Sequence, residues 1–203
     1  MKDNQIKFVN SLKMYKGEEY LLRYLIYITS AVLRKVKPAE LVTFKNKNSN
    51  SFDIWKEHGE YLQKILGILC MKLYEDEDNV SLLFYNIDEL SDVLVQNNSS
   101  PLLVNIGYPA DGSVHDMLLY LKNRFDIRNF PHEIGIFLGY PACDVEAFVE
   151  NEAKNYNHCR YWKVYHNLEE AQKIIDRIDN ARQFAAELLL KLAANKTIQI
   201  LCS

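Results

Sequence analysis

Glycine and proline are scarce in this chain, with 7 glycines and 5 prolines among 203 residues. This scarcity excludes collagen-like chains and low-complexity chains rich in these two residues. Charge of one sign is lacking too, since the formal net charge is −3 and the pI is near 6.0. Proteins that bind nucleic acid usually carry a basic face. We therefore do not expect a nucleic-acid partner.

Long hydrophobic runs are also missing. The most apolar stretch, residues 20–33, is 14 residues long and contains Arg23, whereas a helix that spans a membrane needs about 20 apolar residues. The first residues, MKDNQIKF, lack the apolar core of a secretory signal. These absences predict a soluble, cytoplasmic protein that does not enter the membrane.

Paired cysteines are a further absence. None of the four cysteines belongs to a CxxC pair, and their spacing is irregular. Disulfide frameworks are typical of secreted proteins, so we do not expect one here. The four are Cys70, Cys143, Cys159 and Cys202.

The residues that are present are typical of a globular protein. Hydrophobic residues make up 48% of the chain and charged residues 25%, which is the usual balance. A length of 203 residues is a little above that of one domain. We therefore expect a single domain over residues 1–203 that is large enough to fold without a disulfide or a metal.

Hydrophobic periodicity predicts helices alternating with four strands. The strand at 133–139, EIGIFLG, is apolar on both faces, as a central strand would be. We expect an α/β fold with α+β character, in which a mixed sheet of about four strands is flanked by helices. The predicted strands are 40–44, 80–86, 133–139 and 160–166; the predicted helices are 18–36, 52–74, 87–97, 102–107 (or a strand there), 114–125, 144–156 and 167–195.

The last of these helices, 167–195, is long and amphipathic. Asn167 is placed to cap it, and two glutamates follow in its first turn, where the helix dipole favours negative charge. Its apolar stripe has two interpretations. The helix either packs on a partner, for which a homodimer is the commonest assembly, or simply covers its own sheet.

The segment that follows residue 129 resembles the signature of a bacterial family, domain-of-unknown-function family 3793. It reads FPHEIGIFLGYPACDVEAFVENEAKNYNHCRYWKVY over 130–165, against the family pattern FPHEIG-x-FLGYP-x-x-DV-x-GF, then N-x-G-x-NY, then a glycine and WKVY. More weakly, RKVKPAELVTFK at 34–45 resembles the family's N-terminal segment, in which Lys-Pro precedes a short strand. The resemblance implies a fold and a bacterial origin, and it implies no activity.

The chain departs from the family pattern at several positions. Ala147, Ala153 and Arg160 stand where the pattern has glycine, and the cysteine that relatives often carry near residues 28–30 is absent. The resemblance therefore does not imply, for this chain, a role that depends on that cysteine or on a glycine-lined contact after Asp144.

One hypothesis is a cysteine-dependent enzyme. Cys143 comes just before a predicted helix, where a thiol's pKa is lowered and the thiolate is favoured. His132, with Glu133, or else His158, would act as its base. Against this, neighbours on a strand point to opposite faces, so His132 and Glu133 would diverge. The alternative is a structural histidine and a small buried cysteine in a tight turn.

A second hypothesis is a binding site for a flat anion such as a nucleotide or a flavin. Aromatic side chains cluster in the signature, with lysines and an arginine nearby, and ring faces and cations suit such a ligand. Ordinary packing is the alternative. The ligand-binding candidates are Tyr140, Asp144, Tyr156, Trp162 and Lys163; Tyr161, Tyr165, Lys154 and Arg160 lie near them in sequence.

A metal site is not expected, because His158, Cys159, His166 and Cys143 match no standard ligand spacing, and no cofactor can be named. Since the chain has no known catalytic motif, the leading interpretation is a non-catalytic cytoplasmic binding or interaction protein. Its predicted surface is residues 139–144 and the strand of Trp162. The alternatives are a hydrolytic or redox enzyme using Cys143 with His132 and Glu133, and a sensor for a nucleotide-like or flavin-like molecule.

Overall fold

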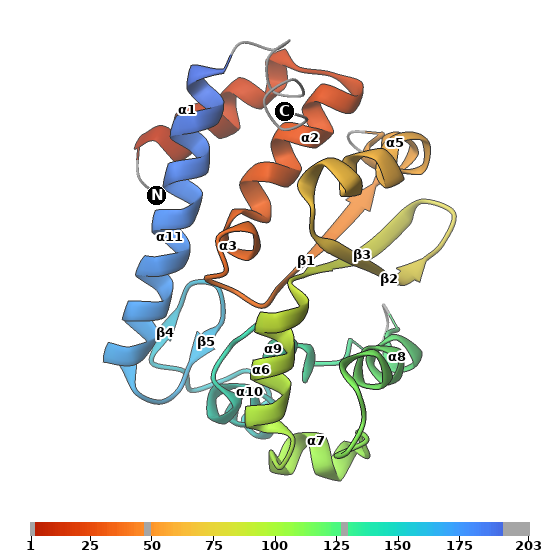
Figure 1. The fold of residues 1–203 in the computed structure, drawn as a ribbon. Helices are drawn as coiled ribbons and strands as arrows, with labels where there is room; N and C mark the ends of the chain where they lie inside the picture. The colour runs from red at the N-terminus through yellow and green to blue at the C-terminus, as the bar shows by residue number, and fades with distance from the viewer. Residues whose placement is uncertain (1–2, 47–49, 127–129, 193–203) are drawn as a thin grey trace.

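A three-stranded antiparallel sheet lies at the centre of the fold (Figure 1). The computed structural model describes residues 3–46, 50–126 and 130–192. Strand β3 (Asn79–Tyr85) is the middle strand, between β1 (Ala39–Lys45) and β2 (Leu69–Glu75). The predictions of strands at 40–44 and 80–86 are confirmed.

The sheet separates two hydrophobic cores, because successive side chains of a strand point to opposite faces. Leu82 and Phe84 of β3 belong to one core, with residues of helices α1 (Asp3–Ser11), α2 (Gly17–Ile28) and α5 (Ser51–Leu66). Leu83 belongs to the other, with residues of helices α6 (Ile87–Asn97), α8 (Val114–Arg124) and α9 (Ile134–Phe137). β3 is thus covered on both faces, as its buried apolar run suggests.

Strand β2 occupies residues for which a helix was predicted. The helix 52–74 was expected to be continuous, but α5 (Ser51–Leu66) ends at Gly67, which has a φ of 64°. A left-handed residue at this position terminates a helix. Residues 69–75 then pair with β3, which supplies partners for their backbone groups.

The predicted central strand at 133–139 is wrong. Residues Ile134–Phe137 form a single helical turn, α9, and the backbone N–H of Leu138 donates to the Ile134 carbonyl. Helix α10 (Ala142–Glu150) packs against this turn, since Val145 of α10 contacts Gly135. A short apolar run on its own does not distinguish a buried strand from a buried helix.

The predicted strand 160–166 is reduced to β5 (Lys163–Val164), which pairs with β4 (His158–Cys159) in a second antiparallel sheet. The described residues therefore combine helices and strands as predicted, but the five strands form two antiparallel sheets in place of one mixed sheet. The α10 helix also stops at Glu150, short of the predicted 156.

The remaining helices agree with the predictions only in part, and no helix was predicted for residues 3–14. The predicted helix 18–36 is interrupted at Thr29, whose hydroxyl donates to the Leu25 carbonyl. The helical reading of 102–107 is confirmed, and Gly107 ends that helix with a φ of 94°. These helices are α1 (Asp3–Ser11), the 3₁₀ turn Leu12–Met14, α2 (Gly17–Ile28), α3 (Ser30–Leu33), α6 (Ile87–Asn97), α7 (Pro101–Ile106) and α8 (Val114–Arg124).

The long C-terminal helix is confirmed as α11 (Leu168–Lys191); residues 193–195 of the prediction lie outside the described residues. The Asn167 side chain caps it by accepting from the Glu170 amide. At its other end, the fully buried Arg23 donates to the carbonyls of Leu189 and Leu192. α11 lies beside α1 and α3 (Figure 1), and its Arg182 guanidinium lies 3.6 Å from the carboxylate of Glu40 on β1.

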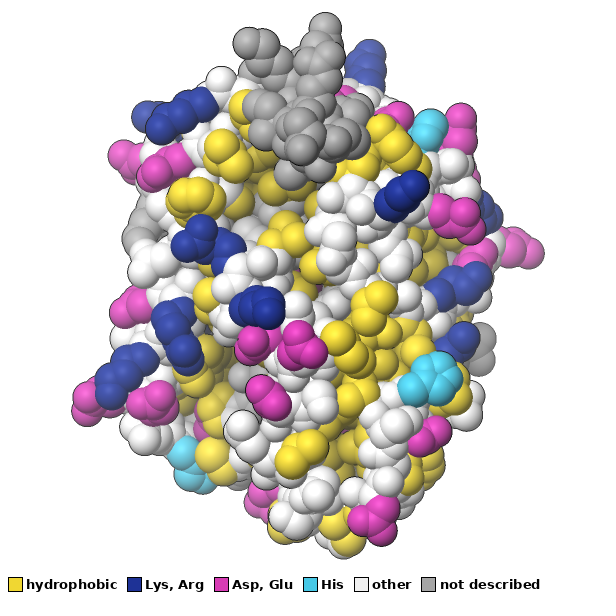
Figure 2. Space-filling model, viewed as in Figure 1, with side chains coloured by type: hydrophobic (Ala, Val, Ile, Leu, Met, Phe, Trp, Pro, Cys, Tyr) yellow, Lys and Arg dark blue, Asp and Glu magenta, His cyan; other side chains and the backbone are white. Residues whose placement is uncertain are grey.

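No helix in the described part of the chain is long and apolar enough to cross a membrane. On the face seen in Figure 2, basic and acidic side chains are interspersed and do not gather by sign. That face carries no continuous basic stripe.

Candidate ligand pocket

The two segments that resemble the family signature contact each other in space. Gly139 has a φ of 79°, and a Cβ added to it would lie 2.5 Å from Cδ of Pro38. Next to this contact, the Lys37 ammonium is 5.2 Å from the centroid of the Tyr140 ring. Lys37 is itself buried and paired with Glu40 at 2.9 Å. The N-terminal Lys-Pro and the later Gly-Tyr thus form one structural unit.

Asp144 joins helix α10 to the small sheet. Its side chain is 2% exposed, and the indole Nε1 of Trp162 donates to one carboxylate oxygen at 2.8 Å. The backbone amides of Tyr165 and His166 donate to the other oxygen, each at 2.9 Å. The first turn of a helix favours a negative charge. This set of hydrogen bonds holds Trp162 against Tyr140, with the rings stacked at a centroid distance of 5.0 Å.

A pocket of about 250 Å³ opens beside these two rings. Its walls are mainly aromatic and aliphatic, and its polar groups are few. The lining residues are Phe130, His132, Ile134, Gly135, Leu138, Tyr140, Asp144, Val145, Phe148, Tyr161, Trp162 and Lys163.

The pocket gathers four of the five ligand-binding candidates: Tyr140, Asp144, Trp162 and Lys163. The fifth, Tyr156, does not line the pocket, but its ring centroid lies 4.6 Å from the Lys163 ammonium. Their convergence depends on the α10 helix and the small sheet meeting at Asp144.

Phe130 and Phe148 are pocket residues that sequence reasoning missed. Phe148 lies one helical turn after Asp144, on the same side of α10, so i to i+4 spacing was the available signal. The His132 imidazole lies between them, with ring centroids 5.0 Å from Phe148 and 6.0 Å from Phe130. His132 is therefore part of an aromatic wall.

Glu133 belongs to a different environment. Its buried carboxylate accepts from Arg124 Nε at 2.6 Å and from the Tyr108 hydroxyl at 3.2 Å. Burial raises the pKa of the Tyr108 hydroxyl, and the Glu133 carboxylate adds to the rise. Tyr108 therefore keeps the proton that it donates to Glu133. Glu133 thus binds Arg124, whereas His132 contacts phenylalanine rings.

Cys143 lies in the first turn of α10, whereas it was predicted to lie just before that helix. Its pKa also shifts in the opposite direction to the prediction. Partial burial raises the pKa of the thiol, and the neighbouring Asp144 carboxylate adds to the rise. These two effects exceed the favourable influence of the helix N-terminus. Cys143 does not line the pocket.

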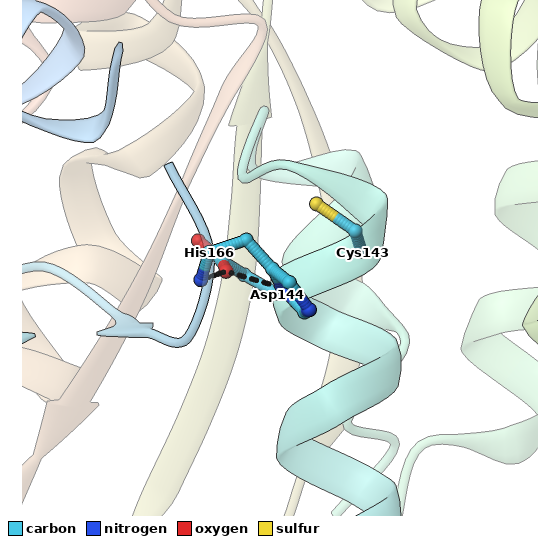
Figure 3. A group of neighbouring side chains, drawn as sticks. All are labelled: Cys143, Asp144 and His166. Carbon is cyan, nitrogen blue, oxygen red and sulfur yellow. Dashed lines mark hydrogen bonds and ion pairs between the residues drawn. The ribbon is translucent and has the colours of Figure 1, made fainter. Parts of the chain in front are cut away.

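One group of side chains has the atom types of a metal site. Cys143, Asp144 and His166 each place a potential ligand atom within 4.8 Å of the others (Figure 3). His158 and Cys159, which the sequence offered as ligands together with Cys143 and His166, are not part of this group. Asp144 already accepts from Trp162, from two backbone amides and, at 3.2 Å, from His166 Nδ1. A metal ion would compete with these hydrogen bonds for the carboxylate.

Comparison with known families identifies the chain. A family model described as "Protein of unknown function (DUF3793)" matches residues 25–199, and the chain therefore belongs to that family. The match includes both segments that carry the resemblance, which is thereby confirmed. No curated protein and no solved structure matches the chain.

Proposed function

We propose that this protein is a non-catalytic binding protein and that its ligand is a small, flat, largely apolar molecule held in the pocket beside Tyr140 and Trp162. The observation that carries the proposal is that family-signature residues distant in sequence converge on this one pocket. Ligand sites are typically apolar clefts with a small number of well-placed polar groups, and this pocket has that composition.

The volume of the pocket limits the size of the ligand. Its volume of about 250 Å³ is slightly below the roughly 300–1,000 Å³ common for ligand sites. A molecule of one or two rings suits it better than a whole nucleotide or flavin. The rings of Phe148 and Trp162 offer aromatic surfaces for stacking.

The cysteine-dependent alternative has less support. A thiol enzyme needs its base within hydrogen-bond reach of the sulfur. Among the described residues, Glu133 pairs with Arg124, and His132 lies between two phenylalanine rings. His166 has a ring nitrogen within 4.8 Å of the Cys143 sulfur, but its Nδ1 is hydrogen-bonded to Asp144 at 3.2 Å. The pKa of Cys143 is raised, which disfavours the thiolate.

Calorimetric titration with 2-naphthamide, a neutral two-ring probe, tests the proposal. We expect measurable binding to the wild-type protein and roughly tenfold weaker binding to Phe148→Ala, because an aromatic contact contributes about 0.5–1.5 kcal/mol beyond its buried area. Tyr61→Ala is the matched control, since Tyr61 is 45% exposed on α5 and outside the pocket. Absence of binding, or equal loss in both variants, would refute the proposal.

We also propose that α11 provides the surface for a homodimer in the cytoplasm. Phe184 and Leu188 are 52% and 42% exposed on this helix although they are apolar, and isologous pairing is the commonest assembly. Light scattering after gel filtration tests it. A dimer that becomes a monomer in Leu188→Glu would support the proposal, and a wild-type monomer would contradict it.

A further inference from the structure

The cations near the pocket differ in whether they have a counter-ion. Arg160 pairs with Asp179 at 3.0 Å, and Lys154 pairs with Glu152 at 2.9 Å. Lys163 forms no ion pair with any carboxylate in the described ranges. Of Arg160, Lys154 and Lys163, only Lys163 also lines the pocket.

The groups that contact the Lys163 ammonium are a backbone carbonyl and two aromatic rings, which attract a positive charge but are themselves uncharged. The Nζ donates to the Ala153 carbonyl at 2.6 Å and lies 4.6 Å from the Tyr156 ring centroid and 5.7 Å from that of Phe148. An ammonium has three N–H donors, so this carbonyl leaves others for a ligand. A half-buried charge is costly without a counter-ion, and an anion entering the pocket would supply one.

The backbone that holds Lys163 has an unusual conformation. Glu152, Ala153 and Asn155 have φ values of 49°, 61° and 59°, in the left-handed region that non-glycine residues seldom adopt. This turn brings the Ala153 carbonyl to Lys163 Nζ. The ammonium is therefore fixed at the pocket by a backbone acceptor that carries no charge of its own.

The other charged group of the pocket does not oppose an anion effectively. Asp144 lines the pocket, but Trp162 Nε1 and the amides of Tyr165 and His166 donate to its oxygens. Hydrogen bonds from these donors compensate the buried negative charge. The pocket thus presents one compensated carboxylate and one cation that has no counter-ion among the described residues.

We propose that the ligand of this pocket carries a carboxylate that pairs with Lys163 while its aromatic body contacts Phe148 and Trp162. This inference rests on the proposed function, since it assumes that a small molecule occupies the pocket. It assigns Lys163 as the residue that makes the pocket prefer an anionic ligand over a neutral one.

Two probes of the same shape test the inference. Titration calorimetry compares 2-naphthoate, which is anionic, with 2-naphthamide, which is neutral. We expect the wild-type protein to bind 2-naphthoate roughly tenfold more tightly, as a charge-assisted hydrogen bond would give. In Lys163→Met this preference should disappear while 2-naphthamide still binds, and in Lys163→Arg it should be retained. The matched control is Lys154→Met, which removes a nearby exposed lysine that is already paired.

The outcomes separate the two proposals. If both probes bind the wild-type protein equally, or if Lys154→Met abolishes the preference as well as Lys163→Met does, the role of Lys163 is overturned and the pocket remains. If neither probe binds, the proposed function fails and this inference fails with it. If Lys163→Met weakens both probes equally, Lys163 only shapes the pocket and the inference is overturned.

Discussion

Gly139 lies directly against Pro38, at the junction of the two signature segments. A Cβ at position 139 would be 2.5 Å from Pro38 Cδ and 2.9 Å from its Cγ, closer than carbon atoms pack. The backbone of Gly139 also has a φ of 79°, which only glycine adopts readily. Both space and conformation therefore require glycine here.

The substitution Gly139→Ala should destabilise the protein by about 2–5 kcal/mol. The left-handed conformation costs an L-residue roughly 1–2 kcal/mol, and overpacking adds about 1–3 kcal/mol. Gly67→Ala is the control, since Gly67 has a φ of 64° and its Cβ would meet nothing within 4 Å. Urea unfolding measures both. Equal losses for the two variants would show that the contact with Pro38 contributes nothing.

Asp144→Asn should destabilise the protein by about 2–4 kcal/mol, because an amide offers one acceptor oxygen where the carboxylate offers two. Its NH₂ group would face either Trp162 Nε1 or the amides of Tyr165 and His166, all of which are donors. Asp92→Asn, at an exposed position of α6, is the control with little expected change. Chemical unfolding of both variants provides the measurement, and similar stabilities would contradict the bridging role of Asp144.

Ala153 and Ala147 stand where the family pattern has glycine, and replacing them by glycine should change the stability of the protein in opposite directions. Ala153 has a φ of 61°, so Ala153→Gly should stabilise the protein by up to about 1 kcal/mol, after the greater entropy of glycine in the unfolded chain is subtracted. Ala147 is buried inside α10, where glycine should cost about 1–2 kcal/mol. Thermal or urea unfolding compares them. A loss of stability in Ala153→Gly would contradict the left-handed conformation at that residue.

Alkylation of Cys143 by iodoacetamide should be slow at neutral pH. Its pKa is raised above the ordinary 9.0 by burial and by Asp144, so about 1% or less of the thiol is ionised at pH 7. The rate should therefore rise as the pH increases past 9. Mass spectrometry of the Cys143 peptide across pH 6–10 gives the profile. Rapid alkylation already at pH 6–7 would restore the thiol-enzyme hypothesis.

Local signals were sufficient for part of the fold. Asn167 caps α11 and Gly107 ends α7, because an N-cap side chain and a left-handed glycine satisfy backbone groups within a few residues of themselves. Residues 40–44 and 80–86 were recognised as strands from their own β-branched and aromatic content. Elements of this kind do not depend on distant partners for their identity.

Other elements could not be assigned from local sequence. Residues 69–75 form a strand because β3 offers an edge to pair with, which a window on the sequence does not contain. Residues 134–137 form a helical turn because Val145 of α10 lies against Gly135. In both cases the local sequence is compatible with either a helix or a strand, and the observed conformation is the one that makes these tertiary contacts.

The amino-acid sequence by itself determined the family and the long C-terminal helix. It also pointed to five ligand-binding candidates, of which four line the pocket. Only the tertiary structure decided how these residues relate to one another. It paired Glu133 with Arg124 away from His132, placed Asp144 as the acceptor for Trp162, and left Lys163 at the pocket with no carboxylate partner in the part of the chain that the structure describes. The physical reason is that chemical type is a property of each residue, whereas burial, pKa and ion pairing depend on neighbours that only folding brings into contact.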